Sequence, residues 1–217
     1  MNEKTVYEKL YDWADDRSIS KQTPERNSFN ANITEETAEF VVGAIGFNTH
    51  EIVDALSDIQ VFAFTELTKY DVRDKNPTET FVEKNVGEFN DMVGAIVVKQ
   101  GAYLEAEDTD TQIKAVKDIA EVAWNTLRQI GYDPVKVMNE TYKEINSRTG
   151  EWNEEAGKWQ KYKTDEAKAL WYTADYTDCL MDEVVYEDTE EDIPMPEQLW
   201  DENGDPIPDP PREENTK

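Results

Sequence analysis

The sequence predicts an all-α fold, organised as a helical bundle. Helical patterns of apolar residues follow one another along most of the chain, and no segment shows the two-residue alternation that is typical of a half-buried strand. With 38% hydrophobic and 11% aromatic residues, the 217-residue chain can bury one substantial core.

Several of the expected helices have a recognisable beginning or end. Thr34 is a suitable N-cap for the second helix, and Pro134 lies at the first-turn position that proline favours in the sixth. Gly46 separates the second helix from the third, and a loop with Gly150 and Gly157 precedes the last. The expected helices span residues 3–16, 34–45, 50–68, 78–102, 111–130, 134–147 and 164–183.

The composition changes at Glu187. Residues 187–217 contain six of the nine prolines and carry 12 acidic against 2 basic side chains. Such a segment buries too little apolar surface to offset its ordering entropy. We therefore expect two parts, an all-α domain over residues 1–186 and an acidic, proline-rich, disordered tail over residues 187–217.

Charge and rare residues exclude several classes of function. The chain has 49 acidic and 22 basic residues, a formal net charge of −27, so it should repel nucleic-acid phosphates and bind no nucleic acid directly. Cys179 and His50 are the only cysteine and histidine, which excludes disulfides and zinc sites built from those residues. The beginning has no signal-peptide pattern and no window is long and apolar enough for a membrane span, which predicts a cytoplasmic protein without membrane contact.

Two short acidic spacings stand out in the first third of the chain. Glu51, Asp54 and Asp58 lie three and seven residues apart, on one stripe of the third expected helix. Apolar residues border this stripe, so the acids lie in a face that must pack. Glu36 and Glu39 repeat the pattern on the second helix, where Gly43 on the same stripe leaves room beside the acids.

Several like carboxylates that are buried together need cations to neutralise them. Mg²⁺, with Mn²⁺ as an alternative, prefers carboxylate oxygens and can bridge to substrate phosphates. The competing interpretation is a solvated helix face, because acid pairs three residues apart arise often by chance in so acidic a chain. The apolar residues beside the acids favour a metal site over a solvated helix face.

The motifs resemble those of a known superfamily. Glu35-Glu36-x-x-Glu39, a short gap, and Glu51-x-x-Asp54 continuing to Asp58 look like the MazG-like all-α nucleotide pyrophosphohydrolases, particularly the phage-borne branch. The superfamily includes the all-α dimeric dUTPases and the phosphoribosyl-ATP pyrophosphohydrolases. The later run EINSRTGEWNEEAGKWQKY is similar to a basic segment of that branch, and the resemblance covers roughly residues 1–180.

The resemblance implies a helical bundle that hydrolyses a nucleoside triphosphate to the monophosphate and pyrophosphate, in the host cytoplasm if the protein is phage-encoded. Glu36, Glu39, Glu51 and Asp54 would hold Mg²⁺, Asp58 would support them or take a second ion, and Glu36 would orient the attacking water. A lysine that is usual in the basic element is replaced here, with Arg148 the nearest substitute. The expected substrate-binding residues are Asn146, Arg148, Lys158 and Lys161.

A weaker second copy of the acidic pattern follows. Glu88 and Asp91 repeat the spacing of Glu36 and Glu39, and Asp118 and Glu121, with Asn125, echo Glu51, Asp54 and Asp58. This suggests a tandem pseudo-repeat, in which one chain builds a bundle that relatives assemble from two subunits. The acids of the second copy are degraded, so the working site is expected in the first. A homo-oligomer is also compatible with the sequence.

Other interpretations remain open at the level of sequence. The basic residues around Arg148 could simply pair with Glu151, Glu154 and Glu155, and Trp152, Trp159 and Trp171 could be core residues instead of platforms for a base. His50 is expected to be a surface or capping residue. The rival function is a non-enzymatic acidic interaction protein or nucleic-acid mimic, and a third is a family member that binds nucleotides without turnover.

Overall fold

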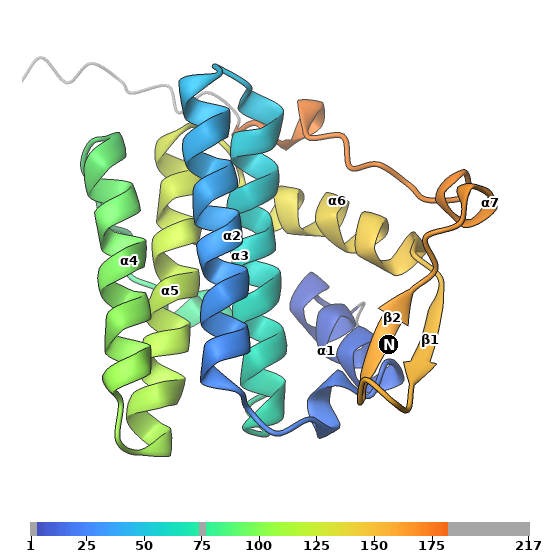
Figure 1. Ribbon diagram of the computed structural model, residues 1–217. Helices are drawn as coiled ribbons and strands as arrows, with labels where there is room; N and C mark the ends of the chain where they lie inside the picture. Colours follow the sequence, from blue (N-terminus) through green and yellow to red (C-terminus); the bar gives the residue numbers. More distant parts are fainter. Residues whose placement is uncertain (1–3, 74–76, 182–217) are drawn as a thin grey trace, which may run out of the picture. The chain divides into compact units, whose positions relative to one another are not determined.

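The computed structural model describes residues 4–73 and 77–181, all of which belong to one unit of the chain. The expected tail, residues 187–217, lies outside the described residues. Helices make up most of the described part, so the all-α prediction is confirmed at the level of class (Figure 1). The α-helices are α1 (Val6–Asp16), α2 (Arg26–Ile45), α3 (Thr49–Lys69), α4 (Phe89–Glu105), α5 (Thr109–Gln129), α6 (Pro134–Ser147) and α7 (Asp165–Lys168), with 3₁₀ turns η1 (Ile19–Lys21), η2 (Pro77–Thr80) and η3 (Thr177–Cys179).

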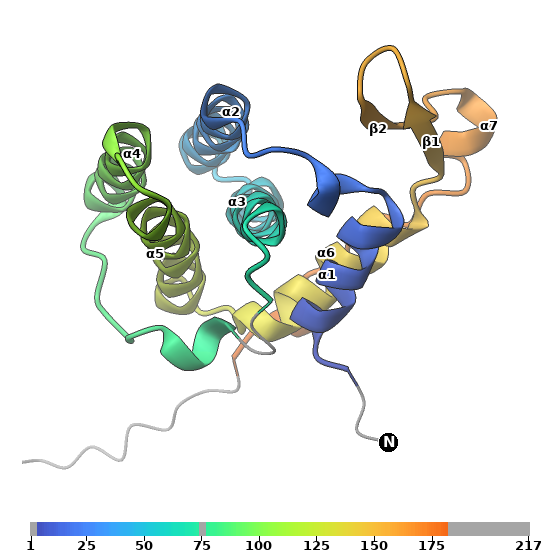
Figure 2. The ribbon, with the colours of Figure 1, turned by 90° about the horizontal axis from the view of Figure 1, so that it is seen from below.

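Four long helices pack as two antiparallel hairpins. The hairpin α2–α3 lies against the hairpin α4–α5, with α2 touching α4 and α3 touching α5 (Figure 2). Phe40, Leu56, Phe64, Ile96 and Ile119 from these helices belong to the hydrophobic core, each at most 1% exposed. None of the described helices is both long and apolar enough to cross a bilayer.

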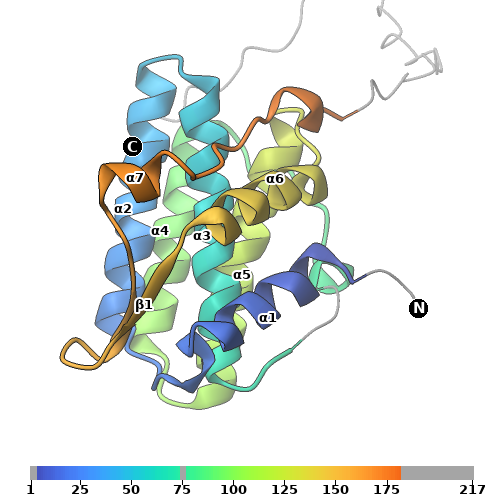
Figure 3. The ribbon, with the colours of Figure 1, turned by 90° about the vertical axis from the view of Figure 1, so that its right-hand side faces the viewer.

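The helix α3 is the centre of the unit. Besides α2 and α5 it contacts α1 and α6, which cross it on the side away from α4 (Figure 3). Thirteen of its 21 residues are buried, including Ser57, Gln60 and Glu66. Because so little of α3 faces solvent, an acidic stripe on this helix must border the interior.

Two helices begin eight or more residues away from the start that the sequence suggested. The expected start of α2 at Thr34 is wrong: the helix begins at Arg26, and the Thr34 hydroxyl donates to Asn30 O one turn earlier at 2.8 Å. The expected helix over residues 78–102 is also wrong in its first part. Gly87 has φ +91°, a value an α-helix does not contain, and Glu88 then caps α4 together with Asp91.

The region expected to be a loop contains a β-hairpin. Strands β1 (Gly150–Asn153) and β2 (Lys158–Lys161) pair antiparallel, with Trp152 opposite Trp159. Gly157 adopts φ +60° in the connecting turn. Strands of four residues are too short to show a convincing alternation, which is why the prediction of no strand failed.

The helix predicted over residues 164–183 is reduced to the single turn α7. Beyond it the chain runs along α6 and α3, with Ala174 and Tyr176 buried on either side of the exposed Asp175. The main-chain N–H of Ala174 donates to Glu144 on α6 at 2.8 Å. The segment after α7 is extended because its contacts with α6 and α3 outweigh its local helix propensity.

The two long hairpins correspond at an offset of sixty residues. Helices α3 and α5 both have 21 residues, from Thr49 and Thr109. Asn48 and Asp108 cap them through their side chains, and Asp71 (φ 58°) and Gly131 (φ 92°) follow them with the same left-handed backbone. Both ends of the two helices are therefore built alike.

Candidate functional site

The first group of acids lies where α2 and α3 run side by side. Gly43 allows the close approach, because a Cβ atom at this position would lie 3.1 Å from both Glu51 Cβ and Ile52 N. Glu36 on α2 is buried, with 8% exposure, although it carries a carboxylate. Asp54 and Asp58 on α3 are half-buried, and Glu39 and Glu51 are more exposed.

Electrostatic coupling shows that these acids form one cluster. Burial and then the charges of Asp58 and Glu39 raise the pKa of Glu36 to about 8. Burial and Asp54 raise the pKa of Asp58 to about 7. The pKa values of Glu39 and Asp54 are also raised, first by burial, and Glu51 acts on both. The structure therefore brings together Glu36, Glu39, Glu51, Asp54 and Asp58, the five residues predicted as metal ligands.

A tyrosine from the end of the described chain holds one of these acids. The Tyr176 hydroxyl donates to Asp54 Oδ1 at 2.8 Å, and its ring lies 5.2 Å from the ring of His50. His50 Nε2 lies 3.1 Å from Ala174 O, so this histidine anchors the same segment. No sequence signal pointed to Tyr176, because the contact joins positions 122 residues apart.

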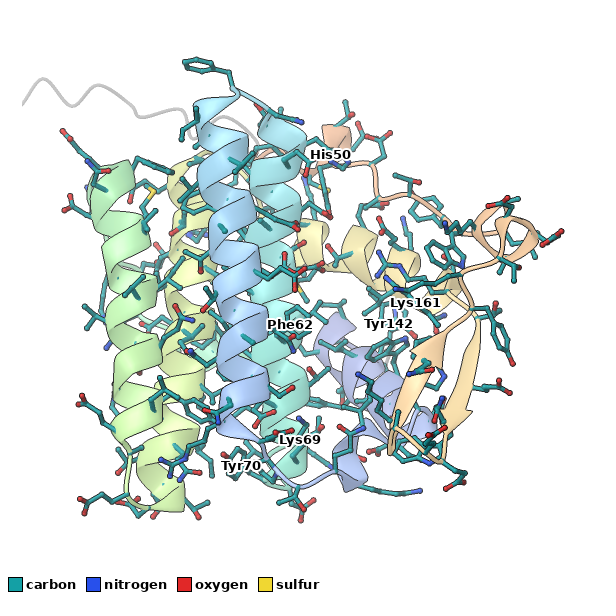
Figure 4. All side chains as sticks on the ribbon, viewed as in Figure 1. His50, Phe62, Lys69, Tyr70, Tyr142 and Lys161 are labelled. Carbon is teal, nitrogen blue, oxygen red and sulfur yellow. The ribbon has the colours of Figure 1, made fainter. Side chains whose placement is uncertain are left out.

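Basic side chains face the acids from α6 and β2. Arg148, just past the end of α6, pairs with Glu144 and acts on Asp58. Burial and the charges of Arg148 and Lys163 lower the pKa of Lys161. The charge of Asp58 acts on the same pKa in the opposite direction. Figure 4 places Lys161, together with Tyr142, between the β-hairpin and α3. Trp171 lies beneath both cations, with its ring centre 5.7 Å from the Arg148 guanidinium and 5.4 Å from Lys161 Nζ.

Two of the predicted substrate-binding residues are not in this group. Asn146 is exposed on α6. Lys158 is exposed and lies an odd number of residues from Lys161 on β2, hence on its opposite face. Glu144 was overlooked, although its position four residues before Arg148 on a helix is a recognisable pairing signal.

The donor set suits a hard divalent cation, because every group in it is a carboxylate. Within residues 4–73 and 77–181, however, no three His, Cys, Asp or Glu side chains converge closely enough to form a ready-made metal site. Mutual repulsion opposes such convergence as long as the charges are not compensated.

The second hairpin has a different character at the corresponding positions. Lys99 and Lys114 both donate to Asp118, at 2.9 and 2.7 Å. Burial alone would raise the pKa of Asp118, but hydrogen bonds from Lys114 and Lys99 lower it. The residues sixty positions after Glu36, Glu39, Glu51, Asp54 and Asp58 are Ile96, Lys99, Thr111, Lys114 and Asp118.

This register differs from the one that the acidic spacings suggested. Glu88 and Asp91 form the cap of α4 and do not correspond to Glu36 and Glu39. Asp118 corresponds to Asp58, and the positions of Glu39 and Asp54 are taken by the lysines that neutralise it. The second hairpin thus carries its own cations where the first carries acids.

Three polar side chains of α5, one acid and two amides, hold an extended segment, residues 82–87. Side chains four residues apart on α5 bond to alternate main-chain groups: Glu121 accepts from Val82 N at 2.9 Å, Asn125 from Lys84 N at 3.0 Å, and Gln129 from Val86 N at 2.9 Å. Four helical residues rise ~6 Å and two extended residues span ~6.6 Å, so the two repeats match. In this amide ladder, main-chain amide groups of residues 82–87 bond to Glu121, Asn125 and Gln129, and the side-chain amides of Asn125 and Gln129 also donate to Val82 O and Gly87 O.

Comparison with models of protein families, with curated proteins and with solved structures found no match to this chain.

Proposed function

We propose that the protein hydrolyses a nucleoside triphosphate, in the presence of Mg²⁺, to the monophosphate and pyrophosphate. The observation that carries the proposal is the acid cluster of α2 and α3, whose nearest cations, Arg148 and Lys161, approach from α6 and β2. Such an arrangement offers oxygen ligands on one side and phosphate donors on the other.

The second hairpin supports this interpretation by contrast. There, two lysines compensate Asp118 within the chain. In the first hairpin the corresponding positions are Glu39 and Asp54, so the cluster has more negative charge and no lysine at these positions. A cluster that served only stability would be expected to resemble the second, because uncompensated acids at a buried face cost free energy. We extend the proposal to the fold, as a tandem pseudo-repeat of the kind found in all-α nucleotide pyrophosphohydrolases.

The chain's own residues take the following roles. Glu36, Glu39, Glu51 and Asp54 hold the metal, with Asp58 supporting them, and Tyr176 fixes the orientation of the Asp54 carboxylate. Bound Mg²⁺ would supply Lewis-acid activation of water and neutralise phosphate charge. Glu36, the most buried of the acids, orients the water and accepts its proton. Arg148 and Lys161 bind the departing pyrophosphate and offset its charge.

The test is a screen for pyrophosphate release from the common NTPs and dNTPs with Mg²⁺ and with EDTA. We expect release from at least one nucleotide in Mg²⁺ and none in EDTA. The double variant Glu51→Gln/Asp54→Asn should lose at least about 100-fold in rate, because two ligands are removed. Glu107→Gln/Asp110→Asn removes the same charge from exposed acids at the α4–α5 turn and should keep the rate.

Absence of pyrophosphate from every nucleotide would refute the enzyme. The second candidate function, an acidic interaction protein, is favoured by a separate observation at the α2–α3 turn, where Phe47 is 93% and Ile45 72% exposed. In that case both double variants should retain partner binding, since more than forty acids remain in either. Nucleotide binding without turnover would identify the third alternative, a non-catalytic binder.

A further inference from the structure

Arg17, at the end of α1, lies against two indole rings. Its guanidinium carbon is 4.5 Å from the ring centre of Trp13 and 5.0 Å from that of Trp159 on β2. Both distances are within the range of a cation–π interaction. The guanidinium is thereby held in place by residues from two elements that are far apart in the sequence.

In a chain with more than twice as many acids as bases, Arg17 forms no ion pair with any described carboxylate. The other arginines that lie over a tryptophan do: Arg128 pairs with Glu83, and Arg148 with Glu144. Nη1 of Arg17 donates to Trp13 O at 3.4 Å, and Nε is enclosed without an acceptor. Nη2 and the second hydrogen of Nη1 therefore remain as two parallel donors.

The position of Arg17 relative to the acid cluster follows from β2. Trp159 and Lys161 are both half-buried and, two residues apart on one strand, project from the same face. Lys161 lies near Asp58 of the cluster, and Trp159, whose ring contacts Arg17, is about 6.6 Å from Lys161 along the strand backbone. The electrostatic neighbours of Arg17 are Asp16 and Tyr142, not the acids of the cluster.

We infer that Arg17, braced by Trp13 and Trp159, recognises the nucleobase of the substrate and selects bases with two adjacent acceptors on one edge. This inference rests on the proposed function, which places the phosphates at Lys161 and Arg148. Guanine offers O6 and N7, and cytosine offers N3 and O2, to a planar guanidinium fork. Adenine, uracil and thymine alternate donors with acceptors and lack such an edge.

The first experiment measures kcat/KM for pyrophosphate release from all common NTPs and dNTPs. We expect guanine or cytosine nucleotides to be preferred over adenine, uracil and thymine nucleotides. Arg17→Met should lower kcat/KM for the preferred base roughly 10- to 100-fold and change the others less than about threefold. Arg17→Lys keeps the charge but not the fork, so it should lose the preference as well.

Arg128→Met is the matched control, because Arg128 lies 4.9 Å from the ring centre of Trp124 but is paired with Glu83. It should leave the base preference unchanged. Thermal melting of each variant separates loss of recognition from loss of folding. No base preference in the wild type, or an equal loss for every base in Arg17→Met, would overturn the inference while leaving the proposed hydrolysis intact.

If no triphosphate is hydrolysed, a binding measurement can still test base recognition by Arg17 separately from the proposed hydrolysis. Calorimetric titration with GMP, CMP, AMP and UMP in EDTA requires no turnover. Tighter binding of GMP or CMP that Arg17→Met abolishes supports base recognition even if no triphosphate is hydrolysed. Equal binding of the four monophosphates, or a preference that survives in Arg17→Met, contradicts it.

Discussion

At the scale of single residues, Glu36 and Asp118 face opposite electrostatic situations on corresponding hairpins. Burial and neighbouring acids raise the pKa of Glu36 to about 8, whereas Lys99 and Lys114 overcome the effect of burial and lower the pKa of Asp118. Linkage turns these directions into opposite dependences of stability on pH. A raised carboxyl pKa destabilises the folded state as pH increases, and a lowered one stabilises it above the pKa of the unfolded chain.

This contrast can be measured in EDTA by chemical denaturation between pH 2 and pH 9. Glu36→Gln should be near-neutral at about pH 4.5 and become stabilising, by about 2 kcal/mol, as pH rises toward the folded pKa of about 8. Asp118→Asn should be destabilising at neutral pH, and its effect should shrink as pH falls through the lowered pKa of Asp118. Parallel pH profiles for the two variants would contradict the assignment of opposite environments.

Helical spacing predicted that the acids lie on adjoining faces of α2 and α3, and in the fold their charges act on one another. It did not identify Tyr176 or Arg17, whose roles depend on segments that meet only in the fold. Tyr176 reaches Asp54 from 122 positions away, and Arg17 meets Trp159 through a hairpin that was not expected. The spacing of residues in a sequence indicates which of them share a face of one helix or strand. It does not indicate which distant segment packs against that face.

At the scale of elements, the helices with strong local signals were predicted well. Pro134 marks the beginning of α6, and residues 134–147 were predicted with the correct bounds. The error at α2 came from treating Thr34 as a cap when Phe29 and Ile33 continue the buried face into the preceding turns. Tertiary anchoring, at Ala174 and elsewhere, decided the segments that the patterns misassigned.

The contact between α2 and α3 at Gly43 gives a prediction for this scale. Gly43→Ala should destabilise the protein by about 1 kcal/mol, since overpacking against Glu51 Cβ and the backbone of Ile52 exceeds the gain in helix propensity. It should also reduce the increase in melting temperature that Mg²⁺ produces, because the acids of the two helices move apart.

Gly101→Ala is the matched control for this substitution. A Cβ atom at Gly101 in α4 meets nothing within 4 Å, so this variant should gain about 0.5–1 kcal/mol from helix propensity. Both stabilities can be compared by urea denaturation. Equal stabilisation by the two substitutions would show that the approach of α2 to α3 is not limited at Gly43.

At the scale of the whole molecule, the net charge of −27 acts against the compact state. Raising NaCl from 20 to 500 mM should increase the melting temperature by about 3–6 °C, because salt screens the repulsion. MgCl₂ at equal ionic strength should increase it further in the wild type but not in Glu51→Gln/Asp54→Asn. An equal response of both proteins to MgCl₂ would assign the effect to general screening.

The amide ladder of α5 determines which substitutions residues 82–87 can tolerate. Glu121, Asn125 and Gln129 bind main-chain groups of residues 82–87, which every amino acid except proline provides in full. The path of the segment is therefore encoded mainly in the helix. Mutations at positions 82, 84 and 86 can accumulate with little effect on that path, whereas a single loss at Asn125 removes bonds to both Lys84 N and Val82 O.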